Sequence, residues 1–218
     1  MTSSTDPSDL DRDKVLEAML REVPFDGWTS TSLRRALPAA GLTDSDGARL
    51  FPGGIADVIT HFVEATDRAM VAALPPEALA AHRVHERVGV IIRKRLELCQ
   101  PHREAIRRAV GTQVRGATGP LLHGLYGTVD TIWRMVGDTA TDFSFYTKRA
   151  TLAAVYSATL LYWLEDTSEG AADTWAFLDR RLKDVMTFHR ARGKLSRLAD
   201  RLPHPVRFFR HSPFGRSR

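Results

Sequence analysis

Apolar residues recur every three or four positions along the first 75 residues, which is the spacing of an amphipathic helix. The pattern predicts four helices, separated by Pro and Gly, over residues 10–23, 29–38, 43–50 and 55–74. The first is expected to stop at Pro24, because proline has no backbone N–H to donate inside a helix. Thr and Ser side chains stand at the starts of the two short helices, where they can cap free backbone N–H groups.

The remainder of the chain continues the helical pattern, and no stretch alternates apolar and polar residues as a strand does. Further helices are predicted over residues 84–99, 101–112, 118–136, 143–165 and 171–190. The sequence therefore predicts an all-α fold.

Residues 150–164 differ from the other predicted helices because they are apolar or small on every face. Such a helix is buried all round, and fifteen residues are too few to span a bilayer. Close contact with another helix is the simpler interpretation of its small side, and room for an apolar ligand is the alternative. That side is formed by Ala150, Ala153, Ala154, Ser157 and Ala158.

The last 30 residues form a basic tail on a slightly acidic body. Residues 189–218 hold nine Lys or Arg and one acid, whereas the whole chain of 218 residues has a net charge of only +5. The spacing of residues in the tail predicts a helix with leucines on one face and basic side chains on the others. The leucines are Leu195, Leu198 and Leu202, and the basic residues are Lys194, Arg197 and Arg201. Such a helix is typical of segments that bind anionic membranes. The alternative is that the leucines pack on the body and the basic residues are solvated.

No set of residues in the sequence predicts catalysis. The one cysteine, Cys99, cannot form an intrachain disulfide or a cysteine-based metal site. No Glu is followed by His three residues later, which argues against a di-iron carboxylate centre, and phosphate-loop, dinucleotide and serine-hydrolase motifs are absent. His82, His85 and Glu86 could share a helical face, but a solvated surface is the simpler interpretation. We therefore expect no metal, no cofactor and no enzymatic activity.

The first 65 residues resemble the helix-turn-helix end of TetR-type regulators, with Gly-Trp-Thr at 27–29 before one short helix and Gly-Leu-Thr at 41–43 before the next. A recognition helix needs basic or amide side chains, but residues 44–50 carry two aspartates and one arginine. We expect an all-α, TetR-regulator-like fold with a degenerate helix-turn-helix region that binds no nucleic acid. A TetR-type transcriptional regulator with a small-molecule pocket is the alternative function, and a lipid-modifying enzyme is a third.

A longer motif lies at residues 137–149, with the pattern Gly-Asp-x-x-Thr-Asp-Phe-x-x-Tyr-Thr-x-Arg, and Asp-Thr-Trp follows at 173–175. The string over 130–182 closely resembles the coenzyme Q (ubiquinone) biosynthesis accessory family, the lipid-binding ninth Coq protein. The similarity extends from residue 10 to the tail and is most specific over this string.

The resemblance implies a TetR-like helical protein without DNA binding that holds isoprenoid lipid in an apolar pocket. It also implies attachment to an anionic membrane surface through the C-terminal helix. The family assists the di-iron demethoxyubiquinone hydroxylase, to which this chain would present a polyprenylated quinone intermediate; we also expect a homodimer. Candidate lipid contacts on the helix predicted over 143–165 are Ala153, Ala154, Ser157, Leu160 and Trp163.

The partner-facing patch implied by the resemblance falls on Ile132 and Trp133 of one predicted helix and on Phe145, Tyr146 and Arg149 of the next. Family members often have Trp where this chain has Phe145, so the patch keeps its aromatic character but loses an indole N–H. Arg149 has a structural alternative, as one partner of an ion pair.

These features divide the chain into a helix-turn-helix-like region (1–72), a helical lipid-binding body (73–190) and a basic membrane-binding tail (191–218). The first residues have neither the basic start and apolar run of a signal peptide nor the character of a mitochondrial transit peptide. We expect a bacterial cytoplasmic protein, peripheral on the inner membrane. For an organellar chain the equivalent place is the matrix side.

Overall fold

The predicted all-α fold is confirmed by the computed structural model, which describes residues 7–113, 119–137 and 143–199. At residues 7, 112–113, 119–122, 143–145 and 188–199 it describes the backbone alone. Every regular element within these ranges is helical. The α-helices are α1 (Pro7–Asp26), α2 (Ser30–Ala39), α3 (Asp44–Leu50), α4 (Ile55–Ala73), α5 (Pro76–Ala80), α6 (Val84–Cys99), α7 (Arg103–Gln113), α8 (Gly119–Val136), α9 (Phe143–Glu165) and α10 (Ala172–Ala199).

Most helix boundaries agree with the hydrophobic pattern, but two predicted ends are wrong. α1 continues past Pro24, because a proline in the last turn leaves only one carbonyl without its helical donor. Gly27 then donates its N–H to the carbonyl of Val23 at 2.9 Å and ends the helix. α10 runs to Ala199 rather than ending at 190, so the expected region boundary at 190/191 lies inside one continuous helix.

The two short N-terminal helices are held by side-chain caps and by one close approach. Thr29 caps α2, and Thr43 and Asp46 form a reciprocal capping box at the start of α3. The hydrogen bonds from Thr43 lower the pKa of Asp46 to about 2. A Cβ atom on Gly47 would lie 2.5 Å from Leu37 Cδ1, so α2 and α3 can approach this closely only because residue 47 is glycine.

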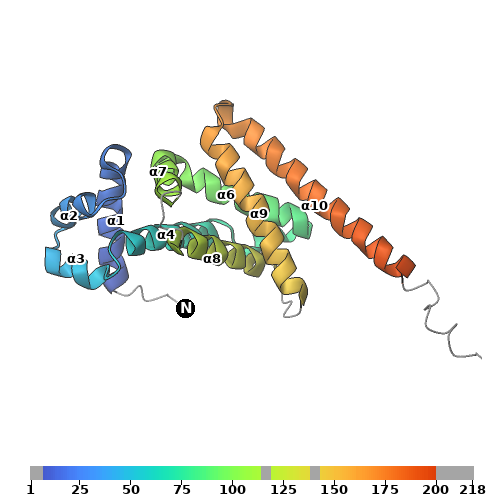
Figure 1. Ribbon diagram of the computed structural model, residues 1–218, viewed down its shortest axis with the longest axis horizontal. Helices are drawn as coiled ribbons and strands as arrows, with labels where there is room; N and C mark the ends of the chain where they lie inside the picture. The colour runs from blue at the N-terminus through green and yellow to red at the C-terminus, as the bar shows by residue number, and fades with distance from the viewer. Residues whose placement is uncertain (1–6, 114–118, 138–142, 200–218) are drawn as a thin grey trace, which may run out of the picture.

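The helices form an elongated arrangement, with α1–α3 at one end and α9 and α10 at the other (Figure 1). α4 contacts α8 and α6 in the body, and α9 lies between α8 and α10. α10 continues beyond the body as a projecting helix (Figure 1). Within the described ranges, no helix is both long enough and apolar enough to cross a membrane.

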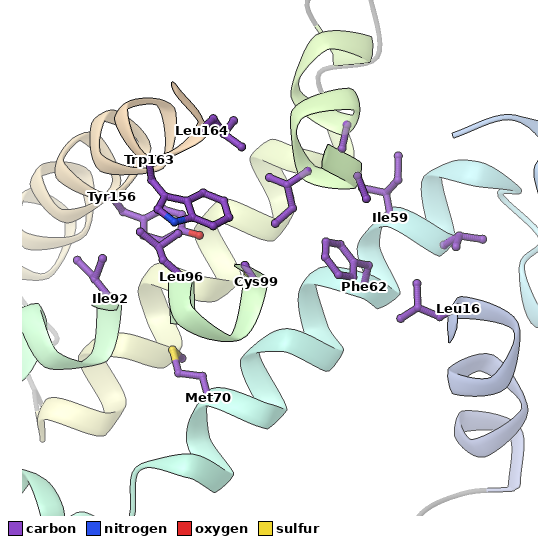
Figure 2. Packing of buried hydrophobic residues seen from close by; sticks show 14 of the residues in the cluster. Leu16, Ile59, Phe62, Met70, Ile92, Leu96, Cys99, Tyr156, Trp163 and Leu164 are labelled. Atoms are coloured by element: carbon purple, nitrogen blue, oxygen red, sulfur yellow. The ribbon is translucent and has the colours of Figure 1, made fainter. Parts of the chain in front are cut away.

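The apolar core is continuous through the body. Figure 2 shows Trp163 and Tyr156 on α9 pointing toward Leu96 on α6. The ring of Phe62 on α4 lies 5.9 Å from that of Trp28 and 6.1 Å from that of His102. Trp163 is fully buried, and the guanidinium of Arg103 stacks on its ring at 5.2 Å. A fully buried aromatic side chain of this size contributes a large share of the apolar area removed from water.

A buried polar cluster lies inside this core, where four helices meet. Arg95 on α6 donates from Nε to Asp67 Oδ1 on α4 at 2.7 Å, and from its fork to Thr128 Oγ1 on α8 at 3.2 Å. Thr128 in turn donates to Asp67 Oδ2 at 2.8 Å. Arg95 also donates to the hydroxyl of Tyr156 on α9, and burial raises the pKa of that phenol. We call Asp67, Arg95, Thr128 and Tyr156 the core polar cluster.

The connection between α9 and α10 is fixed by hydrogen bonds at both helix ends. Arg103 donates to the carbonyl groups of Trp163 and Asp166, which lie at the C-terminal end of α9. The Asp166 carboxylate accepts from the N–H and hydroxyl groups of Ser168 and Thr174. Burial raises the pKa of Asp166, but these hydrogen bonds outweigh that effect and hold the pKa far below its usual value.

We expect Asp67→Ala to destabilise the protein by about 3–5 kcal/mol, because it leaves the Arg95 charge buried without its carboxylate. The free energy of unfolding from urea titration measures this change. Replacing both partners, as Asp67→Leu with Arg95→Met, should cost less than the single substitution because no charge is then left buried.

Glu17→Ala is the matched control, because it breaks the Glu17–Arg21 ion pair of 2.5 Å whose side chains are 72% and 73% exposed. An exposed pair of this kind should contribute less than about 1 kcal/mol. If Asp67→Ala costs no more than Glu17→Ala, the core polar cluster does not stabilise the body.

Candidate functional site

An apolar groove of about 320 Å³ lies between α6, α8, α9 and α10. Its floor is formed by Val88 of α6 with Leu152 and Val155 of α9, all of them buried. Leu182, Val185 and Met186 of α10 form one wall. We call this space, with Val84, His85, Trp133, Lys148 and Thr151 at its sides, the apolar groove.

α9 lines the groove with residues 148, 151, 152 and 155, which share one helical face. The five candidate lipid contacts lie elsewhere on α9, and none of them lines the groove. Trp163 is fully buried beneath Arg103, and Ala154 is exposed. Ala153, Ser157 and Leu160 are half-buried.

The polar groups of the groove lie at its sides and not on its floor. Lys148 Nζ lies over the Trp133 ring at 5.7 Å, and His85 is half-buried. The hydroxyl of Thr151 donates to the carbonyl of Thr147 at 2.8 Å, so it is already hydrogen-bonded to its own helix. The buried Nε1 of Trp133 has no hydrogen-bond partner among the described residues. A groove with this lining favours an apolar ligand whose polar end lies at the side.

Two members of the predicted partner patch are structural. Ile132 is fully buried, so its side chain cannot contact another protein, and its place in the patch is corrected. Arg149 is 5% exposed and holds Asp130 Oδ1 through Nε at 3.0 Å and through its terminal nitrogen at 2.7 Å. The structural alternative for Arg149 is therefore confirmed. Burial raises the pKa of Asp130, but the hydrogen bonds and charges of Arg149 and Arg134 lower it by more, so the pKa lies below its usual value.

The other members of the patch differ in their positions. Tyr146 is 67% exposed, whereas Trp133 is half-buried in the apolar groove. Phe145 belongs to α9, but its side chain lies outside the part of the chain whose side chains are described.

Sequence reasoning missed two exposed residues on α8. Tyr126 is 53% exposed, and the Arg134 side chain, also exposed, pairs with Asp130. Tyr126, Asp130 and Arg134 recur at i, i+4 and i+8 on α8 and so lie in one row. Asp130 links this row to Arg149 on α9. That spacing was a sequence signal, but it pointed to a surface only once the opposite face of α8 was known to be buried. We call Tyr126, Arg134 and Tyr146 the α8–α9 surface.

The helix in the recognition position, α3, is only seven residues long. Asp44, Ser45, Ala48 and Arg49 are exposed on it, and Arg49 pairs with Asp46 at 3.2 Å. The helix therefore offers one cation, which is already neutralised by a carboxylate.

The predicted membrane-binding residues fall largely beyond the described side chains. Lys194, Leu195, Arg197 and Leu198 belong to α10, for which only the backbone is described there. Arg201 and Leu202 lie outside the described residues.

Neither a metal site nor a reactive thiol emerges from the described part of the chain. No group of three or more His, Cys, Asp or Glu side chains in that part is placed to hold a metal ion. Cys99 is buried, and burial raises the pKa of its thiol, which opposes formation of the reactive thiolate.

Known proteins are similar to the part of the chain that forms most of the apolar groove and the α8–α9 surface. The COQ9 family model matches residues 119–189, which include α8, α9 and most of α10. Ubiquinone biosynthesis protein COQ9, mitochondrial, from Rattus norvegicus is 31% identical over 181 residues, which cover 79% of this chain and 58% of the rat protein. Over these residues the chain is similar to members of the COQ9 family. It spans a little under three-fifths of the length of these relatives.

The COQ9 protein of Homo sapiens is likewise 31% identical, over 79% of this chain and 57% of its own length. The protein of Drosophila melanogaster is 30% identical over 80% of this chain and 55% of its own. The matched COQ9 segment contains every groove residue except those of α6.

The expected TetR-like fold is confirmed by a solved structure. The TetR transcriptional regulator from Nitrosomonas europaea superposes with a TM-score of 0.63, at 17% identity, over 79% of this chain and 95% of that one. At this identity the likeness concerns the fold alone.

Proposed function

We propose that this COQ9 homologue is a non-catalytic accessory protein of ubiquinone biosynthesis that binds a polyprenylated quinone intermediate. It would hold the lipid at a membrane surface and present it to the demethoxyubiquinone hydroxylase, without a cofactor of its own. The observation that carries the proposal is the apolar groove, most of which lies within the segment matched by the COQ9 family. The homodimer expected from the sequence remains part of the proposal.

The physical role of such a protein is to lower the cost of exposing a quinone ring outside the bilayer. Each CH₂ group moved from lipid into water costs about 0.8 kcal/mol, so a polyprenyl chain does not leave a membrane unaided. A groove with the buried floor of Val88, Leu152 and Val155 replaces part of the lipid environment and reduces that cost.

We expect Leu152→Trp to fill the groove and to reduce co-purified isoprenoid quinone at least tenfold, because the larger side chain occupies the floor. Mass spectrometry of lipid extracts measures the loss. Leu161→Trp is the matched control, because Leu161 is 53% exposed on the opposite face of α9. Equal lipid content in the two variants would contradict the proposed site.

The hydroxylase contact is proposed to use the α8–α9 surface. Exposed tyrosine and arginine side chains are enriched among residues that dominate protein–protein binding energy. Tyr126, Arg134 and Tyr146 supply such side chains beside the half-buried Asp130–Arg149 ion pair, which connects the two helices.

We expect Tyr146→Ala to weaken binding to the hydroxylase by about 2 kcal/mol, roughly 30-fold, because it removes a large exposed aromatic contact. Titration calorimetry in nanodiscs measures the affinity, and the thermal midpoint checks the fold. Tyr162→Ala is the control, since Tyr162 lies near the other end of α9 and stacks on Phe177 at 4.7 Å. An unchanged affinity for Tyr146→Ala would argue against this surface.

Membrane attachment is proposed to use the tail, by insertion of leucines together with attraction of basic residues to anionic headgroups. Deleting residues 191–218 should abolish flotation with anionic liposomes. Leu198→Glu should reduce the floating fraction at least tenfold, because it places a charge among the leucines of the sequence pattern.

Ser196→Glu is the control for the tail, because it adds the same charge off the leucine face. Flotation of the truncated protein would place the membrane site elsewhere. Unfolding of the truncated protein would indicate that the leucines pack on the body.

The alternative function, a TetR-type regulator, has support from the fold alone. We expect the full chain to show no sequence-selective binding to genomic DNA fragments in gel-shift assays at physiological salt. The reason is that α3 offers two aspartates and a single arginine that is already paired with Asp46. Submicromolar, selective binding would favour the regulator.

A further inference from the structure

The edge of the apolar groove at the start of α6 is exposed and apolar. Val84 is the first residue of α6, lines the groove and is 54% exposed. Val88, one turn later on the same face, is buried in the groove floor. The apolar surface of the groove therefore continues from the floor into solvent at Val84. We call Val84, together with the exposed connection 81–83 before it, the α6 rim.

The α6 rim is fixed to the body on both sides. Leu79, near the end of α5, is buried in the core. Arg87 donates from Nε to the carbonyl of His82 at 2.8 Å. Its terminal nitrogens donate to the carbonyl groups of Ala80 and Val136, each at 3.4 Å. Because Val136 ends α8, these bonds connect the rim to α8, and the exposure of the rim belongs to a defined surface.

The charged side chains at the rim are mostly positive. Between residues 80 and 90 the chain carries Arg83 and Arg87 against Glu86, and Lys148 lines the same part of the groove. The Glu86 carboxylate accepts the backbone N–H of Arg83 at 2.8 Å and so caps α6. The Arg83 side chain is exposed. An exposed apolar side chain with an excess of cations around it is complementary to an anionic membrane surface.

α10 leaves the body beside this rim. A Cβ atom on Gly89 of α6 would lie 3.2 Å from Leu182 Cδ1, so α10 packs closely on α6 there. Met186, one turn later, lines the groove together with Val84, and the helix then continues beyond the body (Figure 1). The tail that is proposed to bind membranes follows on this helix. The rim and the start of the tail are therefore at the same end of the groove.

We infer that the α6 rim is a second membrane contact, which places the open edge of the groove on an anionic bilayer. Val84 inserts below the headgroups, and Arg83 lies among them. This inference rests on the membrane attachment in the proposed function and not on the identity of the lipid in the groove. The tail supplies attachment and the rim sets the orientation, so that an apolar lipid passes between bilayer and groove without crossing water.

The first test compares Val84→Glu with Leu10→Glu in the full chain. Leu10 is the matched control, because it is 50% exposed and lies on α1, at the end of the molecule opposite α9 and α10 (Figure 1). Flotation measures the partition of each protein onto vesicles of phosphatidylcholine with phosphatidylglycerol. Val84→Glu should lower the partition coefficient about fivefold or more, because a charge replaces the inserting side chain, and Leu10→Glu should leave it nearly unchanged.

A fluorescent label reports contact with the bilayer directly. An NBD group on Val84→Cys should brighten and shift to shorter wavelength when these vesicles are added, and the same label on Leu10→Cys should not. Cys99 does not compete for the label, because it is buried and burial raises the pKa of its thiol. Vesicles of phosphatidylcholine alone should give a weaker response, because the attraction between Arg83 and anionic headgroups is then lost.

The results separate this inference from the proposed function. If the wild-type protein does not float, membrane attachment itself is contradicted, and the inference fails with it. If the wild-type protein floats but the label at position 84 does not respond, the tail attaches the protein and the rim is not a membrane contact. A label at position 84 that responds to the purified hydroxylase and not to vesicles would make the rim a protein contact, which also overturns the inference.

Discussion

The ion pair between Arg95 and Asp67 is the interaction on which the arrangement of the body depends. It lies inside the apolar core, where an unpaired charge would cost several kcal/mol, so its partners must stay in place. Thr128 and Tyr156 complete the hydrogen bonding of the guanidinium. Because the four residues come from α4, α8, α6 and α9, satisfying one arginine fixes four helices relative to one another.

The shape of the apolar groove depends on the core polar cluster. Val88 lies two helical turns before Arg95 on α6, and Val155 immediately precedes Tyr156 on α9. The residues that form the floor are therefore on the same two helices that the core polar cluster holds together. α10 completes the groove as a wall, and its start is fixed separately by the hydrogen bonds of Asp166. A shift of α6 against α9 would change the width of the groove and break the cluster.

The same fold carries a regulator in Nitrosomonas europaea and, in this COQ9 homologue, an acidic N-terminal surface with a groove at the opposite end. The helix-turn-helix topology persists because its capping and close helix approach, at Thr43 and Gly47, serve the fold itself. Base recognition requires more than this topology, namely a positively charged surface with hydrogen-bonding side chains. The described side chains of α3 do not form such a surface. The TetR-like fold therefore does not by itself indicate base recognition.

The sequence by itself determined the helices and the family resemblance. Helical periodicity, caps and short motifs are local properties, so they can be identified without knowing which elements meet. The sequence could not determine which face of α9 lines the groove, because residues 150–164 are apolar or small all round and favour no direction. It also could not separate exposed Tyr146 from buried Ile132 and Arg149. The structural role of Arg149 became visible only through its ion pair with Asp130, which lies on another helix. Only the tertiary structure decided these points, because burial and ion pairing depend on residues that are distant in the chain.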